Sequence, residues 1–388
     1  MTDVLAIVGP RIFDGQRWHD DAALVLEGAR VKAIVERTSL GPEIARVVLD
    51  SDMLVPGFVD LQVNGGGGVL FNQDPSHQAI ATICAAHARF GTTSLLPTLI
   101  TDTPEITARA VAAGLESHQA GQPGFMGLHL EGPHLSLARK GAHDPGLIRP
   151  MTAGDQARLA AAAKALPHLL LTVAAETVPP EQVAALAASG VRVSIGHSDA
   201  GYAHAMACAD AGATMVTHLF NAMSPLGHRE PGVVGAALDH GALWCGLIAD
   251  GIHVHPAAIG AALRAKRGPG RLFLVTDAMS LTGWHEDSFT LNGRTITRAG
   301  GALRLADGTL AGADLTMIDA VAYMHETIGE SLEESLRMAS LYPAQAIGAA
   351  RERGHLQPGA RADFVCLGDR LDVQATFIAA QEVFSHEA

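Results

Sequence analysis

Residues 191–221 read VRVSIGHSDAGYAHAMACADAGATMVTHLFN, and the order of elements in this stretch decides the fold. It contains two short apolar runs, Val191–His197 and Met215–His218, and each run ends in a histidine. The segment between them is rich in alanine, and Ser198 and Asp199 at its start are residue types that begin helices. A strand, a helix and a second strand in this order predict two parallel strands joined by a crossover helix.

The same unit recurs through the centre of the chain. Eight short apolar runs, each followed by a helix-like stretch, are expected to be strands. They are Leu54–Gln62, Ser94–Thr98, Phe125–Glu131, Leu169–Glu176, Val191–His197, Met215–His218, Trp244–Asp250 and Leu272–Asp277. Eight such units over about 290 residues predict an α/β fold, a (β/α)8 TIM-type barrel. An open doubly wound sheet is the competing architecture, but it would gather functional residues at one switch point rather than at many strand ends.

Both ends of the chain have a different pattern, with short strand-like runs and no helical periodicity. These runs are Ala23–Leu26, Val31–Val35, Val47–Leu49, Asp363–Leu367 and Thr376–Ile378. We therefore expect a small β-sandwich domain built from residues 1–54 and 352–388. Residues 55–351 would form the barrel, with a β-hairpin inserted near residues 285–310.

Composition and charge exclude several classes of protein. The 388 residues carry 27 Lys and Arg against 40 Asp and Glu, a net charge of −13. Such an acidic chain is not expected to bind nucleic acid or a membrane surface, because both partners attract basic proteins. The four cysteines are widely spaced, which excludes a disulfide scaffold and indicates a reducing compartment. No signal peptide or membrane-spanning run is evident, so we expect a cytoplasmic protein.

Four predicted strands end in residues that bind metals or transfer protons. These residues are Glu131, His197, His218 and Asp277. In a parallel barrel the strand ends converge on one mouth, and two imidazoles with one carboxylate form a three-ligand catalytic zinc set. Fe²⁺, Co²⁺ and Mn²⁺ accept the same ligands. A lone histidine is usually structural, but four such residues at four strand ends favour a metal site, with Asp277 as the base.

Loops on the same face carry further candidates. His143 follows the third strand and His253 follows the seventh, while His228 and Arg229 lie together after the sixth and would suit an anionic group. A solvated loop position is the open alternative for each of them. The glycine run 65–68 lacks the Lys-Ser/Thr of a phosphate-binding loop, so we interpret it as a tight turn.

Short motifs in a fixed order extend these candidates over nearly the whole chain. They are VPGFVDLQVNG (55–65), HLEGP (129–133), KGAH (140–143), GHS (196–198), THLFNAM (217–223), REPG (229–232), IADGIH (248–253), VTDA (275–278) and LAG (310–312). Together they resemble the N-acetylglucosamine-6-phosphate deacetylase family of the amidohydrolase superfamily. The resemblance implies the same barrel with a terminal β domain. It also implies hydrolysis of N-acetylglucosamine 6-phosphate to glucosamine 6-phosphate and acetate, in amino-sugar catabolism.

The resemblance also implies roles for individual residues. Glu131, His197 and His218 would bind one divalent metal, Zn²⁺ being the expected ion, while Asp277 would act as general base and acid. His143 would donate a hydrogen bond to the acetamide carbonyl. The residues implied to contact the substrate are Gln62, His143, Asn221, Ala222, His228, Arg229, His253, Leu310, Ala311 and Gly312. Arg229 would reach the phosphate in the neighbouring subunit, which implies a homodimer.

One motif departs from the superfamily and limits the metal count. The usual His-x-His after the first strand is here Gln62-Val63-Asn64, so two ligands of a second metal are missing. We therefore expect one metal per subunit. Another amidohydrolase remains an alternative, either a deacetylase for N-acetylgalactosamine 6-phosphate or a cyclic-amide hydrolase. A non-catalytic scaffold is disfavoured, because the three metal candidates and the base are all present.

Overall fold

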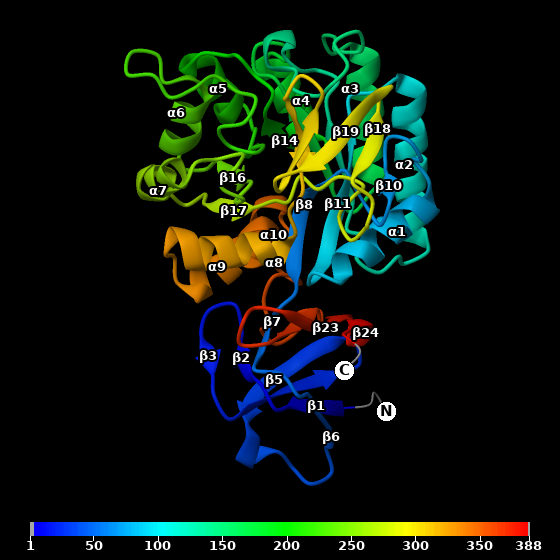
Figure 1. Cartoon of the computed structure of the whole chain (residues 1–388), viewed down its shortest axis with the longest axis vertical. Helices are drawn as coiled ribbons and strands as arrows, with labels where there is room; N and C mark the ends of the chain where they lie inside the picture. Colours follow the sequence, from blue (N-terminus) through cyan, green and yellow to red (C-terminus); the bar gives the residue numbers. More distant parts are fainter. Residues whose placement is uncertain (1–3, 387–388) are drawn as a thin grey trace.

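The computed structural model describes residues 4–386 and has two parts (Figure 1). A barrel with its helices occupies the upper part of the view, and sheets formed by the two ends of the chain lie below it. Both termini are in the lower part, so the chain leaves the small sheets, builds the barrel and returns.

Eight parallel strands form the barrel, which confirms the predicted architecture. They are β8 (Phe58–Val63), β11 (Thr92–Ile100), β12 (Leu128–Glu131), β13 (Leu169–Val173), β14 (Arg192–Ile195), β15 (Met215–Val216), β16 (Trp244–Leu247) and β17 (Leu272–Leu274). Neighbours in sequence are neighbours in the sheet. The first and last strands meet through the Asn64 amide and the Ala278 carbonyl, 2.8 Å apart, and through the Asp277 amide and the Gln62 carbonyl, 3.0 Å apart.

Helices cover the outside of the barrel. They are α1 (His77–Ala88), α2 (Pro104–Gln119), α3 (Ala153–Ala165), α4 (Pro180–Ala188), α5 (Tyr202–Asp210), α6 (Gly232–Asp239), α7 (Pro256–Ala265), α8 (Met317–Ala322), a π-helical turn (Tyr323–Ile328), α9 (Leu332–Ala339) and α10 (Leu341–Ile347). Two short 3₁₀ turns lie elsewhere, Arg37–Ser39 between β5 and β6 and Leu137–Arg139 at the mouth of the barrel. The expected start of α5 is wrong, because that helix begins only at Tyr202. Ser198 instead donates its hydroxyl to Glu176, and Asp199 pairs with Arg139, so neither side chain caps the helix.

Two sheets from the chain ends pack face to face, as the predicted sandwich requires. One contains β5, β4, β1 and β6 (Arg30–Glu36, Ala22–Glu27, Val4–Val8, Ala45–Val48). The other contains β24, β23, β22, β7, β2 and β3 (Gln381–Ser385, Val373–Ile378, Phe364–Leu367, Met53–Pro56, Arg11–Phe13, Trp18–His19). Leu24 and Leu26 of the first sheet share one buried core with Leu54 and Phe364 of the second. The predicted run Leu54–Gln62 is therefore divided, because its first residues belong to β7.

A four-stranded antiparallel sheet is inserted after β17, where one hairpin was expected. Its strands are β18 (Ser288–Leu291), β19 (Arg294–Ala299), β20 (Ala302–Leu305) and β21 (Leu310–Ala313). Gly300 and Gly301, with φ of 60° and 74°, turn the chain between β19 and β20 and so join two hairpins into one sheet. A smaller hairpin, β9 (Gly65–Gly66) with β10 (Val69–Leu70), follows the first barrel strand.

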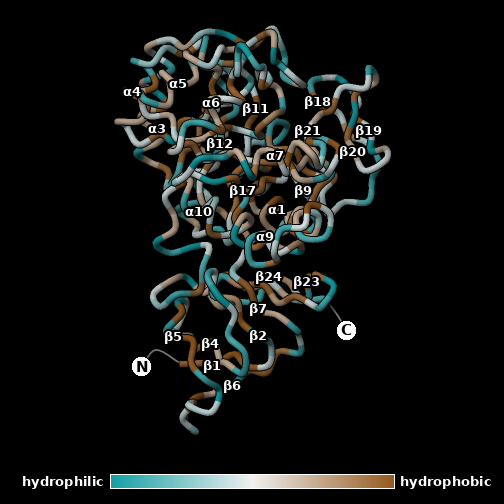
Figure 2. The backbone as a smooth tube through the Cα atoms, turned by 90° about the vertical axis from the view of Figure 1, so that its left-hand side faces the viewer, coloured by the Kyte–Doolittle hydropathy of each residue, from teal (hydrophilic) through white to brown (hydrophobic). Residues whose placement is uncertain are grey.

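Apolar side chains fill the interior of both parts. In Figure 2 the hydrophobic stretches of the trace lie mainly in interior strands and helices, and hydrophilic stretches lie in the peripheral loops. The four cysteines are buried and free. Within residues 4–386 no helix combines the length and the apolar character needed to cross a bilayer.

Candidate active site

The carboxyl ends of the barrel strands surround a cavity of about 350 Å³. Of the residues named from the sequence, those lining it are Glu131, His143, His197, His218, Asn221, Ala222, His253, Asp277, Leu310, Ala311 and Gly312. They come from seven separate segments that the barrel brings together, and β21 of the inserted sheet closes one side. Active sites of this fold occupy this face of the barrel.

Three donor atoms form a compact triangle at the bottom of the cavity. Glu131 Oε1 lies 3.1 Å from His197 Nε2 and 3.1 Å from His218 Nε2, and the two imidazole nitrogens are 3.1 Å apart. An ion bound tetrahedrally to three atoms with this spacing would have bonds of about 1.9 Å, close to the usual Zn–N and Zn–O distances. The donor set therefore fits one divalent metal.

The neighbours of these ligands support that assignment. His197 Nδ1 lies 2.7 Å from the Arg139 carbonyl and must donate to it, so in the neutral ring the unprotonated Nε2 faces Glu131 and can bind a metal. Burial alone would raise the pKa of Glu131, but the two histidines hold it well below its usual range. A donor atom of His143 also lies within 4.8 Å of Glu131 and His197. The Nδ1 atom of His143 is, however, engaged by Thr101, so His218 completes the tighter set.

Asp277 lies beside the triangle and is held by two amides. Its Oδ1 accepts hydrogen bonds from Asn64 Nδ2 at 2.7 Å and Gln62 Nε2 at 3.0 Å. Gln62 Nε2 also lies 3.2 Å from Glu131 Oε1, so this amide separates two carboxylates. Burial, and secondarily the charge of Glu131, raises the pKa of Asp277 to about 6. Within residues 4–386 no donor contacts Asp277 Oδ2, and that oxygen is available for proton transfer.

The protonation of His143 follows from its contacts. The backbone amide of Thr101 donates to His143 Nδ1 at 3.3 Å, and the Thr101 hydroxyl lies 2.8 Å from the same nitrogen. Because a backbone N–H can only donate, Nδ1 is the acceptor and the proton of the neutral ring is on Nε2. Burial, and then the neighbouring His197, lowers the pKa of His143 to about 3. His143 is thus a neutral donor in the wall of the cavity.

His253 is oriented by an acidic neighbour in the loop after β16. Its Nδ1 lies 2.6 Å from Asp250 Oδ2, and Asp250 also accepts the His253 backbone amide. Burial alone would raise the pKa of Asp250, and the bond from His253 reverses that effect and lowers it. The ring is therefore fixed, and its second nitrogen remains for a ligand in the cavity.

Three of the candidates do not line the cavity within one chain. His228 and Arg229 are exposed on the loop before α6 and are not among the residues that line the cavity. Gln62 lies beneath the cavity, where it contacts Glu131 and Asp277 rather than the open space. Their roles as substrate contacts stay predictions.

Several site residues were missed by the sequence analysis. Asn64 binds Asp277, Thr101 orients His143, and Arg139 contributes its carbonyl to His197 and lines the cavity. Asn64 could have been found, because it lies two residues after Gln62 and therefore on the same face of the strand. Thr309 also lines the cavity, and its position in the turn between β20 and β21 gave no signal.

The backbone is strained at the residues that carry the proposed chemistry. His197, His218 and Asp277 have φ values of 47°, 29° and 51°, a region that residues with a side chain rarely adopt. Such strain accumulates where function requires a side chain to point in a particular direction. All three lie two or three residues beyond the end of their strand, where the chain turns the side chain into the mouth.

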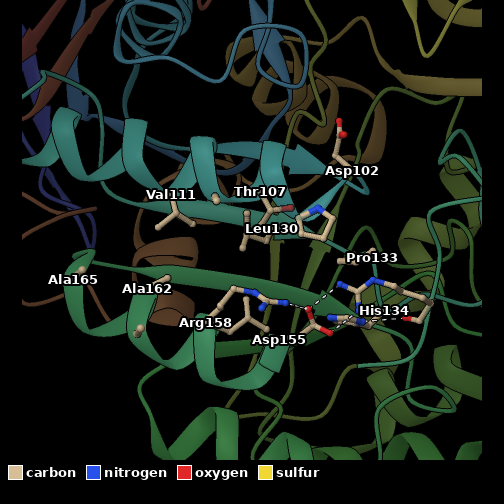
Figure 3. A pocket seen from close by; sticks show the side chains of 16 residues that line it. Asp102, Thr107, Val111, Leu130, Pro133, His134, Asp155, Arg158, Ala162 and Ala165 are labelled. Carbon is tan, nitrogen blue, oxygen red and sulfur yellow. Dashed lines mark hydrogen bonds and ion pairs between the residues drawn. The ribbon is translucent and has the colours of Figure 1, made fainter. Parts of the chain in front are cut away.

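A second cavity of about 350 Å³ lies outside the barrel, between α2 and α3 (Figure 3). Its walls are largely apolar, including Val111, Leu130 and Ala162. At its rim Asp155 already accepts hydrogen bonds from Arg149 and from Arg158, and Figure 3 labels Asp155 and Arg158 with the dashed line between them. This cavity contains neither the donor triangle nor Asp277, so it is not the candidate active site.

Known proteins share both the sequence and the fold of this chain. Residues 53–383 match the Amidohydrolase family. An N-acetylgalactosamine-6-phosphate deacetylase of Shewanella sp. (strain ANA-3) is 42% identical over 339 residues, covering 87% of this chain and 85% of that protein. An N-acetylglucosamine-6-phosphate deacetylase of Danio rerio is 38% identical over 351 residues, with coverages of 87% and 86%.

A solved structure agrees with these relatives. The crystal structure of N-acetylglucosamine-6-phosphate deacetylase from Pasteurella multocida has a TM-score of 0.94 to this chain at 34% identity, covering 99% of this chain and 100% of that one. The resemblance inferred from the motifs is thereby confirmed. The chain belongs to the amidohydrolase family, in the branch of the N-acetylglucosamine-6-phosphate deacetylases and their N-acetylgalactosamine counterparts.

Proposed function

We propose that this protein hydrolyses the N-acetyl group of N-acetylglucosamine 6-phosphate, with glucosamine 6-phosphate and acetate as products. The observation that carries the proposal is the triangle of Glu131, His197 and His218 beside Asp277, in a cavity of a chain from this family. A divalent ion at the triangle, Zn²⁺ in our proposal, would polarise the amide carbonyl and acidify water.

Asp277 moves the proton in both halves of the reaction. Its Oδ1 is fixed by Asn64 and Gln62, so Oδ2 accepts the proton of the attacking water. The water oxygen then bonds to the carbonyl carbon. As the bond between that carbon and nitrogen breaks, Asp277 returns the proton to the departing amine. The carboxyl group thus ends each cycle in the state in which it began.

His143 acts on the other atom of the amide. Its Nε2–H donates a hydrogen bond to the carbonyl oxygen, and the bond strengthens as negative charge develops there. Thr101 holds the ring in the tautomer that makes this possible. Because His143 is neutral before the reaction, it stabilises the charge without transferring a proton.

The phosphate is assigned to His253 of the same chain and Arg229 of a second chain. His253 lines the cavity, whereas Arg229 is exposed and does not line the cavity of its own chain. This arrangement makes the protein a homodimer with a site completed across the interface. We place the enzyme in the cytoplasm, where phosphorylated sugars are held.

N-Acetylgalactosamine 6-phosphate is a second candidate substrate. It is favoured by the Shewanella relative, whose identity of 42% exceeds the 38% of the Danio relative. Acetate release from both 6-phosphates, from unphosphorylated N-acetylglucosamine and from a cyclic amide separates the possibilities. We expect the glucosamine isomer to have the highest kcat/KM. Metal-loaded protein that releases no acetate from either 6-phosphate would refute the proposed function.

A further inference from the structure

A cavity with several arginines lies at the end of the barrel opposite the candidate active site. We call it the arginine cavity; it has a volume of about 570 Å³, and its polar lining includes His118, His168, Arg351, Glu352, Arg353 and Arg361. These residues belong to segments that precede β12, β13 and β22 or follow α10. The cavity therefore lies where strands β12 and β13 begin, whereas Glu131 lies where β12 ends.

The positive charge of this cavity is only partly balanced. Arg353 and Arg361 share the single carboxylate of Asp363, each at 2.9 Å. Glu352 is already paired with Arg30 at 3.0 Å. This excess of cations is found on a chain whose net charge is −13.

Two further guanidinium groups make no direct contact with a carboxylate in the described part of the chain, although the charge of Arg351 helps to lower the pKa of Glu352. Arg351 makes no hydrogen bond or ion pair with any part of the chain between residues 4 and 386. The same holds for Arg192, whose guanidinium lies beside Gly348 of the cavity wall. Arg192 and Arg351 thus remain available to an anion.

Helix ends do not account for these arginines. Cationic side chains often stabilise the carboxyl end of a helix by binding its last carbonyls. Here backbone amides already bind the carbonyls at the ends of α2 and α10: Gly121 donates to His118, and Gly348 donates to Gln345, each at 3.1 Å. The guanidinium groups are therefore not required to cap either helix.

The electrostatic potential inside the cavity is positive. Burial, and then the charges of Arg353 and Arg192, lowers the pKa of His168 to about 4. Burial lowers the pKa of Arg353 as well, and the neighbouring Arg361 adds to this effect although Asp363 opposes it. An anion between these groups would relieve the repulsion.

We propose that the arginine cavity binds a small phosphate-bearing molecule. A guanidinium group pairs with phosphate oxygens through two parallel hydrogen bonds, and a phosphate monoester carries up to two negative charges where a carboxylate carries one. The volume is that of a pocket for a small metabolite. The site is separate from the phosphate contact assigned to His253, and the proposal does not depend on the reaction.

Equilibrium dialysis of the metal-loaded protein against inorganic phosphate at low ionic strength tests this proposal. We expect one phosphate per chain whose binding is weakened about tenfold or more in Arg351→Gln, because a charge-assisted hydrogen bond is lost. Arg192→Gln should weaken the binding of the same phosphate, and Arg351→Lys should retain most of the wild-type affinity for phosphate. Any phosphate held in the catalytic mouth is identified separately by its loss in His253→Ala.

The matched control is Arg264→Gln, which removes the same charge from the exposed side of α7. It should bind phosphate as the wild type does. Arg351→Gln should keep the wild-type kcat and KM measured without added phosphate, since Arg351 lies outside the catalytic mouth. The proposal is overturned if Arg351→Gln and Arg192→Gln both bind phosphate as tightly as the wild type. It is also overturned if His253→Ala abolishes all phosphate binding.

Discussion

The buried imidazole of His87 should make the protein less stable in mild acid. This residue of α1 is fully buried, and its Nε2 donates to the carbonyl of Gly65 at 2.9 Å. Burial lowers the pKa of His87 to about 4, and the bond to Gly65 opposes the shift only in part. Gly65 directly follows the segment that carries Gln62 and Asn64, so the contact also anchors the turn beside the site.

The size of the effect follows from the difference between the folded and unfolded pKa values. A histidine in the unfolded chain has a pKa of about 6.5, so acid protonates the unfolded state first. The contribution of the neutral, buried His87 to the stability of the folded state is therefore complete above about pH 6.5 and is lost as the pH falls towards 4. Between pH 7 and pH 5 this single residue should remove about 2 kcal/mol from the free energy of unfolding.

Denaturant unfolding of the wild type and of His87→Gln at both pH values measures this contribution. Glutamine keeps an amide donor for Gly65 but does not titrate, so the variant should lose about 2 kcal/mol less than the wild type over this interval. Other titrating groups, including the metal ligands, contribute equally to both proteins and cancel in the comparison. Equal pH dependence of the two proteins would refute the assignment of a neutral buried His87.

The remaining predictions concern the catalytic mouth. His197→Ala and His218→Ala should each lose metal and activity together, and elemental analysis of the wild type should give one metal per chain; two per chain would contradict the ligand set. Asp277→Asn should retain the metal and the KM while kcat falls by several orders of magnitude, since both proton steps use this residue. Arg229→Ala should raise KM about ten- to a hundredfold for the phosphorylated substrate alone. Mixed dimers of Arg229→Ala and Asp277→Asn should regain one working site, and no recovery would place the arginine elsewhere.

The sequence was sufficient to predict the barrel because its signals are local and repeated. Each apolar run followed by an alanine-rich stretch indicates one strand and one helix, and eight repeats leave few architectures. The polar residues at strand ends were equally accessible, because Glu131 and Asp277 interrupt apolar runs. Their roles as ligand and base rest on chemistry that only metal analysis and kinetics will test.

Other features depended on contacts between distant residues. Leu54 was assigned to a barrel strand because the apolar residues on both sides of Pro56-Gly57 were read as one run, although this dipeptide is a turn signal and lies where β7 ends and β8 begins. Ser198 and Asp199 matched the pattern of a helix start, but Glu176 and Arg139 compete for their side chains. Helix-capping propensity describes the behaviour of a residue that has no tertiary contact, and in this fold Glu176 and Arg139 provide such contacts.

The site residues could be predicted from their residue types, but the orientation of their side chains could not, because it depends on the backbone conformation at the strand ends. His197, His218 and Asp277 adopt positive φ values that their own propensities disfavour, so no local pattern could have predicted them. Hydrogen bonds from other segments offset the conformational strain of these positive φ values. They include the bond between His197 and the Arg139 carbonyl and the bond from the Asn64 amide to Asp277. Replacing Asn64 should therefore move Asp277 as well as remove a hydrogen bond. Asn64→Ala should lower kcat more than it raises KM, whereas a residue acting only in substrate binding would change KM alone.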